Sequence, residues 1–524
     1  MNEALATWVQ GLKNPECYSH SVDQVRVVET HISWVVLTGF YAYKIKKPVK
    51  YSFVDFSTLE KRRWFCEEEV RLNRRLAPEV YLGIVPITGL PTNPHIDGQG
   101  TPFEFAVKMK QFSSAQEIHD ILASGEKAEV CISQLADRIA TFHAKIEKAG
   151  EHSPYGNPDM VWKPMKECFD EIPLEFLTQT TQKSLTIINR WLQKEWRNVS
   201  DIILHRKHAG FVRECHGDLH LGNIAMFEGS VCVFDALEFE PRLRWIDVMS
   251  EVAFLVMDLE KHGSQDLAFV FLNRYLELTG DYEGLRVFRL YQVYRALVRA
   301  KVAGLRLAQL AESGVEEEKA KCELTGYVEL AHRFIACASP ALVLMHGISG
   351  TGKTTVSTEI VKSIGAIRVR SDVERKRLFA ETLKPKTKVH QDAGLYHLDM
   401  TARTYDQLRN LARTLIQAGF SVVVDATFLR HHQRELFRML AKEHVCAWFI
   451  VDVFAPESVL EERIERRSRE GHDASDATVA IMERQQEIEE SFTPAEQPYV
   501  ISMDSTDTQA ILSAIRAIKE KAEI

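Results

Sequence analysis

The spacing of apolar positions changes twice along the chain. In residues 1–112, apolar and polar positions alternate in short runs, which predicts strands at Val25–Thr30, Trp34–Thr38, Tyr41–Lys46, Tyr81–Thr88 and Glu104–Met109. One helical stretch interrupts them: Ser57-Thr58-Leu59-Glu60 has the form of a capping box at its start, and Pro78 sets its end at Ala77. We expect a small antiparallel sheet with one long helix.

Residues 113–335 have mainly helical spacing, for example in Ile132–Lys148, Ser184–Trp196 and Ile246–Leu259. The exception is a predicted hairpin, in which Ile224–Phe227 and Val231–Phe234 flank a turn at residues 228–230. A larger helical lobe is therefore expected to follow the small β lobe.

After residue 340, short apolar runs alternate with helical stretches. The predicted strands are Ala341–Met345, Ile367–Arg370, Ser421–Val424 and Ala447–Val453. This alternation predicts a parallel sheet flanked by helices, an α/β fold, because parallel strands need crossover connections. We therefore divide the chain into residues 1–112, 113–335 and 340–524.

Composition and charge narrow the class of protein. The chain has 524 residues, enough for about three domain-sized units. Residues 1–339 contain 40 Lys and Arg against 46 Asp and Glu, and residues 340–524 contain 25 against 27. Neither part has the basic balance that favours binding to nucleic acid.

Three further features indicate a cytoplasmic location. The N-terminus lacks the basic and apolar regions of a signal peptide, and no apolar run approaches the roughly 18 residues of a membrane span. The nine cysteines, an odd number without a C-x-x-C pair, are typical of a reducing compartment.

The segment His216–Asn223 reads H-G-D-x-x-x-x-N, a spacing suited to phosphoryl transfer. In such a loop, Asp218 would take the proton of an acceptor hydroxyl and Asn223 would bind Mg²⁺. Asp235, at the end of the predicted hairpin, stands where a second carboxylate for the metal is needed. A turn that caps a helix is the structural alternative for Asp218 and Asn223, and His216 is expected to brace the loop.

Upstream, Lys44 lies in an A-x-K sequence on a predicted strand, where a lysine can neutralise nucleotide phosphates. Its expected partner is Glu69 on the following helix, with Glu67 and Glu68 as rivals. The structural alternative is that Lys44 is one solvated lysine among several on that strand. Lys44 and Lys46 share one face of it.

A second phosphate-binding signature, G-x-x-x-x-G-K-T, follows the strand Ala341–Met345. Its glycines let backbone amides surround phosphates, Lys353 reaches β and γ oxygens, and Thr354 binds Mg²⁺. The residues expected to touch ATP or its metal are Gly347, Ser349, Gly350, Thr351, Gly352, Lys353, Thr354 and Thr355.

Polar residues near other predicted strands complete this second site. Asp425 ends one strand and is the expected metal-binding acid, and Asp372, just after another, would activate an acceptor hydroxyl or simply cap a helix. A helix beyond the fourth strand carries arginines expected to clamp phosphates, with a solvated basic face as the alternative: Arg463 and Arg467, beside Arg466 and Arg469.

The loop at 216–223 resembles that of the aminoglycoside phosphotransferase and choline kinase group, over residues 20–335. The resemblance implies a bilobal protein-kinase-like fold that phosphorylates a small hydroxyl compound. The turn at His31-Ile32-Ser33 lacks a glycine-rich loop, and Asp247 follows Asp235 closely, which leaves no room for a long peptide-docking segment. Aminoglycoside inactivation does not follow from these motifs.

Residues 341–500 resemble P-loop kinases such as gluconate kinases, zeta-type toxins and polynucleotide kinases. The resemblance rests on the P-loop, Ser371-Asp372 with Arg375, Val424-Asp425-Ala426-Thr427 and the arginine-bearing helix. It implies a kinase but leaves the acceptor open. The residues considered for the acceptor side lie between Lys384 and Thr401: Lys386, Lys388, His390, Tyr396 and His397.

The sequence thus predicts a bifunctional, ATP- and Mg²⁺-dependent phosphotransferase for small hydroxyl compounds, without a membrane partner. In one alternative the C-terminal part is a polynucleotide 5′-kinase, which residues Arg375-Lys376-Arg377 with Lys384, Lys386 and Lys388 would favour. In another, one half senses nucleotide and regulates the other.

Overall fold

The computed structural model describes residues 7–51, 54–112, 118–309, 314–336, 339–382, 393–470 and 479–522. The chain forms two compact units. The first comprises Met1–Asp170 with Ser200–Asp258, and the second Glu171–Val199 with Leu259–Ile524. The division expected from sequence, at 112, 335 and 340, follows changes of pattern and stays a prediction.

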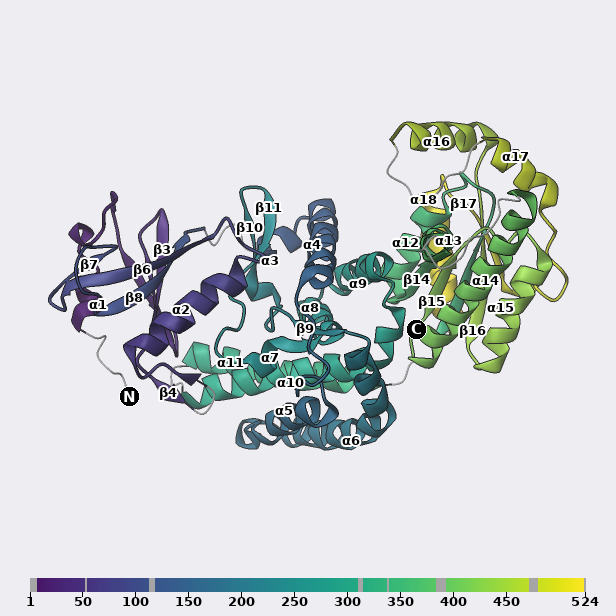
Figure 1. Cartoon of the computed structure of the whole chain (residues 1–524). Coiled ribbons are helices and arrows are strands. Elements are labelled where there is room, and N and C mark those ends of the chain that lie inside the picture. The colour runs from purple at the N-terminus through teal and green to yellow at the C-terminus, as the bar shows by residue number, and fades with distance from the viewer. Residues whose placement is uncertain are drawn as a thin grey trace. The chain divides into compact units, whose positions relative to one another are not determined.

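The first unit contains a six-stranded antiparallel sheet with the order β1-β2-β3-β8-β6-β7 (Figure 1). Its strands are β1 (Arg26–Glu29), β2 (Ser33–Leu37), β3 (Tyr41–Lys46), β6 (Tyr81–Leu90), β7 (Asn93–Ile96) and β8 (Glu104–Lys110). Five of them match predicted strands. The sixth, β7, was not predicted. Its Pro94 is tolerated there because β7 is an edge strand.

Helix α2 (Leu59–Asn73) packs on this sheet. Its N-cap is Thr58, which accepts a hydrogen bond from the Lys61 amide, so the predicted capping box is displaced by one residue. The Ser57 hydroxyl instead donates to Asp55 Oδ1 at 2.5 Å. The helix also ends before the predicted Ala77, in a turn that buries Ala77 against the core.

The rest of the first unit positions a loop between two short strands. Strand β9 (Val212–Glu214) pairs with β12 (Trp245–Asp247), and the hairpin β10 (Ile224–Phe227) and β11 (Ser230–Val233) follows the loop. Glu228 and Gly229 both have positive φ, at 48° and 78°, as a two-residue hairpin turn requires. The unit also contains α4 (Glu126–Lys145), α5 (Pro158–Asp170) and most of α8 (Val248–Lys261).

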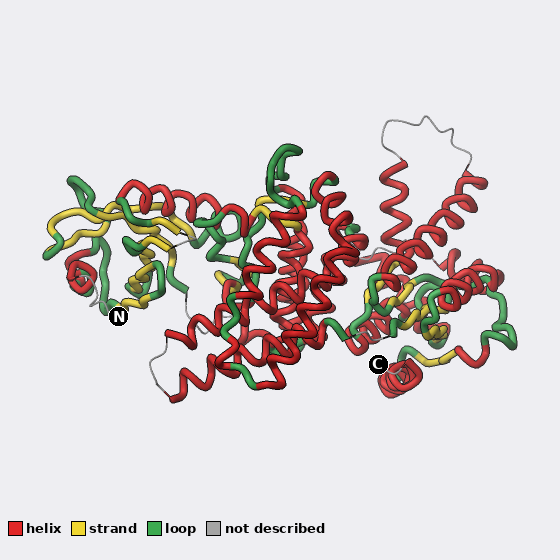
Figure 2. The backbone as a smooth tube through the Cα atoms, turned by 90° about the horizontal axis from the view of Figure 1, so that it is seen from below, coloured by secondary structure: helices red, strands yellow, loops and turns green. Residues whose placement is uncertain are grey.

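The second unit contains a five-stranded parallel sheet with the order β14-β15-β13-β16-β17. The strands are β13 (Ala341–His346), β14 (Ile367–Arg370), β15 (Val422–Asp425), β16 (Ala447–Phe454) and β17 (Val500–Asp504). The predicted parallel sheet is confirmed, and only β17, a half-exposed edge strand, was missed. Helices flank the sheet (Figure 2): they include α12 (Lys353–Ile364), α14 (Ala393–Gln417), α15 (His431–Glu443) and α18 (Thr508–Ala522).

Three further helices of the second unit precede the sheet in sequence: α9 (Gln265–Thr279), α10 (Leu285–Gln309) and α11 (Gly314–Phe334). The long helix α6 (Gln179–His208) begins in this unit and ends in the other. In the described ranges, no helix is both long and apolar enough to cross a lipid bilayer.

Candidate active sites

The loop between β9 and β10 brings Asp218 and Asn223 into contact. Asn223 Nδ2 donates to Asp218 Oδ2 at 3.0 Å and to the Asp218 carbonyl oxygen at 2.9 Å. His220 Nε2 lies 3.3 Å from the same carboxylate oxygen. Because its nitrogen is committed to Asp218, Asn223 offers its side-chain oxygen as the atom that can bind a cation.

Two acidic residues of α8 hold this loop by its backbone. The Gly217 amide donates to Glu251 Oε1 at 2.7 Å, and the Leu221 amide donates to Asp258 Oδ2 at 2.9 Å. Gly217 has a φ of 90°, and a Cβ atom there would lie 2.9 Å from the carbonyl oxygen of Leu243. Both acids were missed, although their spacing of two helical turns in an apolar stretch places them on one face of a helix.

His216 braces the loop, as expected. Its Nδ1 accepts a hydrogen bond from the Asp218 amide at 3.3 Å, and Nε2 lies 2.9 Å from the Phe234 carbonyl oxygen. Burial lowers the pKa of His216. The neutral ring, with its proton on Nε2, satisfies both contacts.

His143, Cys215 and Glu251 place three groups able to bind metal within 4.8 Å of one another. Glu251 already accepts from the Gly217 amide and lies 2.8 Å from His143 Nε2. Burial raises the pKa of the Cys215 thiol well above its usual value, which opposes the thiolate that a metal needs. The contacts of Glu251 with Gly217 and His143 indicate that this cluster supports the loop and does not bind a metal.

Lys44 of β3 contacts its predicted partner Glu69 and also Asp235, which was predicted to bind the metal. Its Nζ lies 2.5 Å from Asp235 Oδ1 and 2.9 Å from Glu69 Oε1. Burial opposes the charge of Lys44, but these carboxylates outweigh it and hold its pKa well above the usual value. Asp235 has a φ of 63°, rare for a residue with a side chain, and its amide donates to the Tyr81 hydroxyl at 3.2 Å. Of the three glutamates considered, Glu69 is the one that contacts Lys44.

A second lysine, Lys46, was not predicted as part of the site. Its Nζ lies 2.5 Å from Glu69 Oε2 and also pairs with Glu238. Burial raises the pKa of Glu69, but the two lysines outweigh it and lower the pKa to about 2, whereas burial raises the pKa of Glu238. The Lys46 side chain is 0% exposed and that of Lys44 14%, so only Lys44 is accessible to a ligand.

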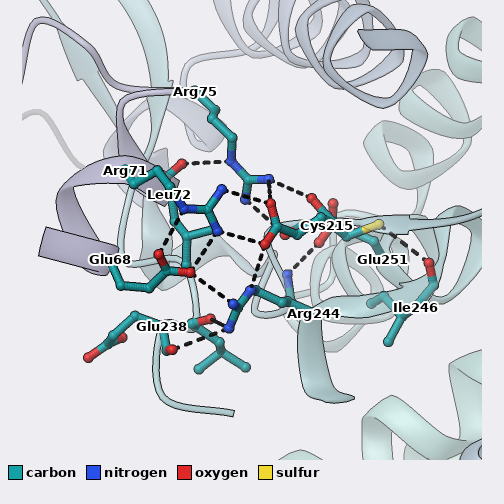
Figure 3. Close-up of polar contacts among 12 residues, drawn as sticks. Glu68, Arg71, Leu72, Arg75, Cys215, Glu238, Arg244, Ile246 and Glu251 are labelled. Carbon is teal, nitrogen blue, oxygen red and sulfur yellow. Dashed lines mark hydrogen bonds and ion pairs between the residues drawn. The ribbon is translucent and has the colours of Figure 1, made fainter. Parts of the chain in front are cut away.

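Three arginines, labelled Arg71, Arg75 and Arg244 in Figure 3, pair with the carboxylate of Glu214, which ends β9 just before the loop. Arg71 donates to its carboxylate at 2.7 and 3.0 Å, and Arg75 at 3.2 Å. Arg244, at the end of α7 (Pro241–Arg244), donates to it at 3.2 Å and to Glu68 at 2.9 Å. Burial opposes the charge of Glu214, but the arginines outweigh it and lower its pKa. The network ties α2 to the strand that leads into the loop.

In the second unit, the loop Gly347–Gly352 joins β13 to α12, and Lys353 and Thr354 form the start of that helix, as the motif predicts. Gly347 has a φ of 130°, and a Cβ atom there would lie 2.4 Å from the Val453 carbonyl oxygen, so only glycine fits. Gly350 and Gly352 also have positive φ. Lys353 Nζ donates to the Ile348 carbonyl oxygen at 2.7 Å, and the Thr351 hydroxyl donates to the same oxygen.

Two side chains from α16 (Glu457–Glu470) and α17 (Val479–Ile488) contact this loop. The Ser349 amide donates to Gln485 Oε1 at 2.7 Å. Arg463 donates to the Gly350 carbonyl oxygen at 3.3 Å and to the Ser505 hydroxyl at 2.9 Å. Arg463 was predicted to lie here, but Gln485 and Ser505 were missed because nothing in their local sequence marks them.

Asp425 ends β15, where it pairs in register with Met345 of β13 and Arg370 of β14. Its Oδ2 lies 3.5 Å from Ser357 Oγ and 3.9 Å from Arg370 Nε. Asp372 follows β14 in the first turn of α13 (Ser371–Thr382), so the two predicted acids occupy the same edge of the sheet.

The remaining predicted residues are exposed or undescribed. Thr355 is exposed on the first turn of α12. The backbone of Arg467 belongs to α16, but its side chain lies outside the described part of the structure. The same holds for the side chains of Arg466, Arg469, Tyr396 and His397, and for residues Lys384, Lys386, Lys388 and His390.

Both predicted Mg²⁺ sites offer hard oxygen donors, which this ion prefers. Asn223 and Asp235 supply an amide oxygen and a carboxylate in the first unit, and Thr354 and Asp425 a hydroxyl and a carboxylate in the second. The donor sets fit the ion.

A family model described as an AAA domain (AAA_33) matches residues 342–490. The chain is also 29% identical over 473 residues to uncharacterized proteins from Mycobacterium tuberculosis (strains CDC 1551 and H37Rv) and Mycobacterium bovis. This similarity covers 90% of the chain and 92% of each of those proteins. An alignment of that length includes both motif loops.

The solved structures similar to parts of the chain include two kinases. Amicoumacin kinase hAmiN, in complex with AMP-PNP, Ca²⁺ and Ami, is 12% identical, with a TM-score of 0.37; the match covers 62% of this chain and 93% of that one. A gluconokinase from Sinorhizobium meliloti 1021 is 20% identical, with a TM-score of 0.26, over 36% of this chain and 97% of that one. We describe the fold by the strand orders of the two large sheets and by the loops after β9 and β13.

Replacement of the two lysines of β3 should have different effects: one on stability and the other on ATP turnover. Lys46→Met leaves Glu238 buried without its cation, so we expect the free energy of unfolding to fall by about 3–5 kcal/mol. Lys44→Met should lower ATP turnover at this site by about 100-fold or more, with a smaller loss of stability. Denaturant titration measures the loss of stability, and an ATP turnover assay measures the loss of activity. Both use a Lys353→Ala background, so that the remaining turnover belongs to the first site.

Lys50→Met is the matched control, because this side chain is 73% exposed. It should change neither quantity. Wild-type stability of Lys46→Met, or wild-type turnover of Lys44→Met, would contradict the assignment of one lysine to structure and the other to ligand binding.

Glu214→Gln should destabilise the first unit, because it leaves three guanidinium groups without their shared carboxylate. We expect a loss of about 3 kcal/mol in the free energy of unfolding, at the low end for a buried pair because Arg71 is half exposed. The control is Glu67→Gln, whose exposed pair with Arg63 should contribute less than about 0.5 kcal/mol. Equal stability of the two variants would show that the network does not hold α2.

Proposed function

We propose that the chain is an ATP- and Mg²⁺-dependent phosphotransferase with two active sites, each of which transfers the γ-phosphoryl group to a hydroxyl of a small molecule. The observation that carries the proposal is the contact of Lys44 with Glu69 and Asp235, which lie far apart in sequence. A lysine held in this way by a helix glutamate and a metal-binding aspartate is the arrangement that phosphoryl transfer requires. The AAA-domain match over residues 342–490 supports the second site.

At the first site, Asp218 accepts the proton of the acceptor hydroxyl as the hydroxyl oxygen bonds to the γ-phosphorus. The bond from that phosphorus to the bridging oxygen breaks, and ADP leaves. Lys44 neutralises charge on the phosphates through its partly exposed ammonium group. Mg²⁺ held by Asn223 and Asp235 would neutralise the remaining charge on the phosphate oxygens.

At the second site, the backbone amides of the loop and the N-terminus of α12 surround the phosphates. Lys353 leaves the Ile348 carbonyl oxygen and binds β and γ oxygens. Thr354 and Asp425 would hold Mg²⁺, which would neutralise charge on the phosphates. Asp372, at the same edge of the sheet as Asp425, takes the proton from the hydroxyl group of the acceptor molecule. Gln485 gives up the Ser349 amide when a phosphate takes its place.

The short connection after Asp235 supports a small acceptor at the first site. Residues 236–244 reach β12 through α7, and Arg244 is fixed by Glu214 and Glu68. No long segment that could dock a peptide lies in this described stretch.

Basic residues near Asp372 supply less support for a nucleic-acid acceptor than their sequence suggests. Arg375 lies 3.1 Å from Asp372 Oδ1, and Arg377 pairs with Glu374 and donates to the Glu277 carbonyl oxygen at 2.8 Å. Salt-sensitive binding of single-stranded oligonucleotides would nevertheless restore that alternative.

Separate loss of two products should reveal two independent sites. We expect a product-mass screen against sugars, amino alcohols, nucleosides and oligonucleotides to yield two phosphorylated classes. Asp218→Ala should reduce one by about 10²–10⁴-fold, the range for loss of a general base, and Lys353→Ala the other.

Glu67→Gln, an exposed carboxylate on α2, is the control and should preserve both products. If neither Asp218→Ala nor Lys353→Ala lowered phosphoryl transfer, the proposed function would be wrong. If Lys353→Ala changed turnover at the first site, the second site would be a regulator of it rather than an independent kinase.

A further inference from the structure

We infer that helix α9 is part of the P-loop site, and that its Glu277 is a positioning residue for the groups that bind Mg²⁺ there. The inference rests on the proposed function of this site. Glu277 lies outside residues 340–524, the stretch expected from sequence to form the P-loop kinase. It acts through two arginines of β14 and contacts neither predicted metal ligand itself.

The first of these arginines is Arg368. Its Nη2 and Nε donate to Glu277 Oε1 at 2.8 and 3.2 Å, and both side chains are nearly buried. Its Nη1 donates to the Thr354 carbonyl oxygen at 3.2 Å, the Ser357 hydroxyl at 3.2 Å and the Thr358 hydroxyl at 2.7 Å. One guanidinium group therefore joins Glu277 to the first turn of α12, which carries the predicted Mg²⁺ ligand Thr354.

The second arginine, Arg370, lies between two carboxylates. Its Nη1 is 3.7 Å from Glu277 Oε2, and its Nε is 3.9 Å from Asp425 Oδ2. Without the charge of Glu277, Arg370 would pair more closely with Asp425 and compete with a cation for that carboxylate. Glu277 thus keeps Asp425 available for Mg²⁺.

A further residue of α9, Asn273, completes the outer edge of the sheet. Its Nδ2 donates to the Ala366 carbonyl oxygen at 3.0 Å, and its Oδ1 accepts from the Arg368 amide at 2.6 Å. The side-chain amide thereby takes the place of a neighbouring strand beside β14, the edge strand. The helix also approaches closely at Gly365, where a Cβ atom would lie 2.9 Å from the ring of Phe269.

These contacts give α9 two tasks at the P-loop site. Asn273 fixes the position of β14, and Glu277 orients the two arginines that β14 presents. Mutation of a residue that orients a metal ligand commonly costs 10–100-fold in metal affinity. An effect on Mg²⁺ binding, separate from stability, is therefore the expected sign of the positioning role.

The test uses the full chain in an Asp218→Ala background, so that the remaining ATP turnover belongs to the P-loop site. We expect Glu277→Gln to raise the Mg²⁺ concentration needed for half-maximal turnover by about 10–100-fold, with a smaller change in turnover at saturating Mg²⁺. Adding Arg370→Met should restore much of the Mg²⁺ affinity, because the competing cation is gone. Glu277→Asp should be intermediate.

Glu283→Gln is the matched control, since this exposed carboxylate accepts a hydrogen bond from the Thr414 hydroxyl at 3.1 Å and pairs with Arg286 at 3.5 Å rather than with Arg368 or Arg370. It should leave the Mg²⁺ dependence unchanged. Equal Mg²⁺ dependence in Glu277→Gln and its parent would overturn the inference, as would an equal effect of Glu283→Gln.

Hydrogen exchange separates this inference from the proposed function. Measured without nucleotide, amide exchange at residues 354–358 should be about tenfold faster in Glu277→Gln than in the parent, because Arg368 loses its anchor. This result would support the positioning role even if the parent turned over no ATP, an outcome that would reject the proposed function alone. Unchanged exchange would reject the positioning role.

Discussion

The buried carboxylate of Glu69 is the contact on which the first site depends. Each of its oxygens faces a different lysine, so the helix α2 cannot shift along β3 without leaving a charge unpaired in a place where water does not compensate it. The pairing also divides the work between the lysines. Lys46 is fully enclosed and fixes the helix, whereas Lys44 lies at the accessible end and is the lysine that the proposed function assigns to a phosphate.

The same physical solution recurs around both loops. Carboxylates from helices outside each motif bind either backbone amides or guanidinium groups: Glu251 and Asp258 support the loop of Asp218, and Glu277 supports the turn that follows Lys353. A carboxylate that accepts several such donors in a buried position is both satisfied and immobile. The positions of the motif residues therefore depend on acidic residues that lie outside the motifs.

The local sequence correctly predicted those features of the structure that depend on residues close together in the chain. The two loops, the hairpin turn at Glu228-Gly229 and most strands follow from spacing and from glycines that need positive φ. The start of α2 was misplaced because Ser57 found a partner in Asp55, a competition that the capping pattern does not encode. The edge strands β7 and β17 were missed because their half-exposed positions give little apolar signal.

Partners far apart in sequence set the limit of such reasoning. The alternation in β3 placed Lys46 beside Lys44, but its pairing with Glu238 involves residues 192 positions apart, and that of Gln485 with Ser349 involves 136. No periodicity links such positions.

The supports for both loops lie in consecutive helices, because Glu251 and Asp258 belong to α8 and Glu277 to α9. This one stretch of the chain therefore serves both candidate sites. A recombination event at residue 340, where the spacing of apolar residues changes, would transfer the whole phosphate loop without Glu277, the acid that pairs with Arg368 and Arg370. The match to the mycobacterial proteins extends over 90% of the chain, so it includes both helices.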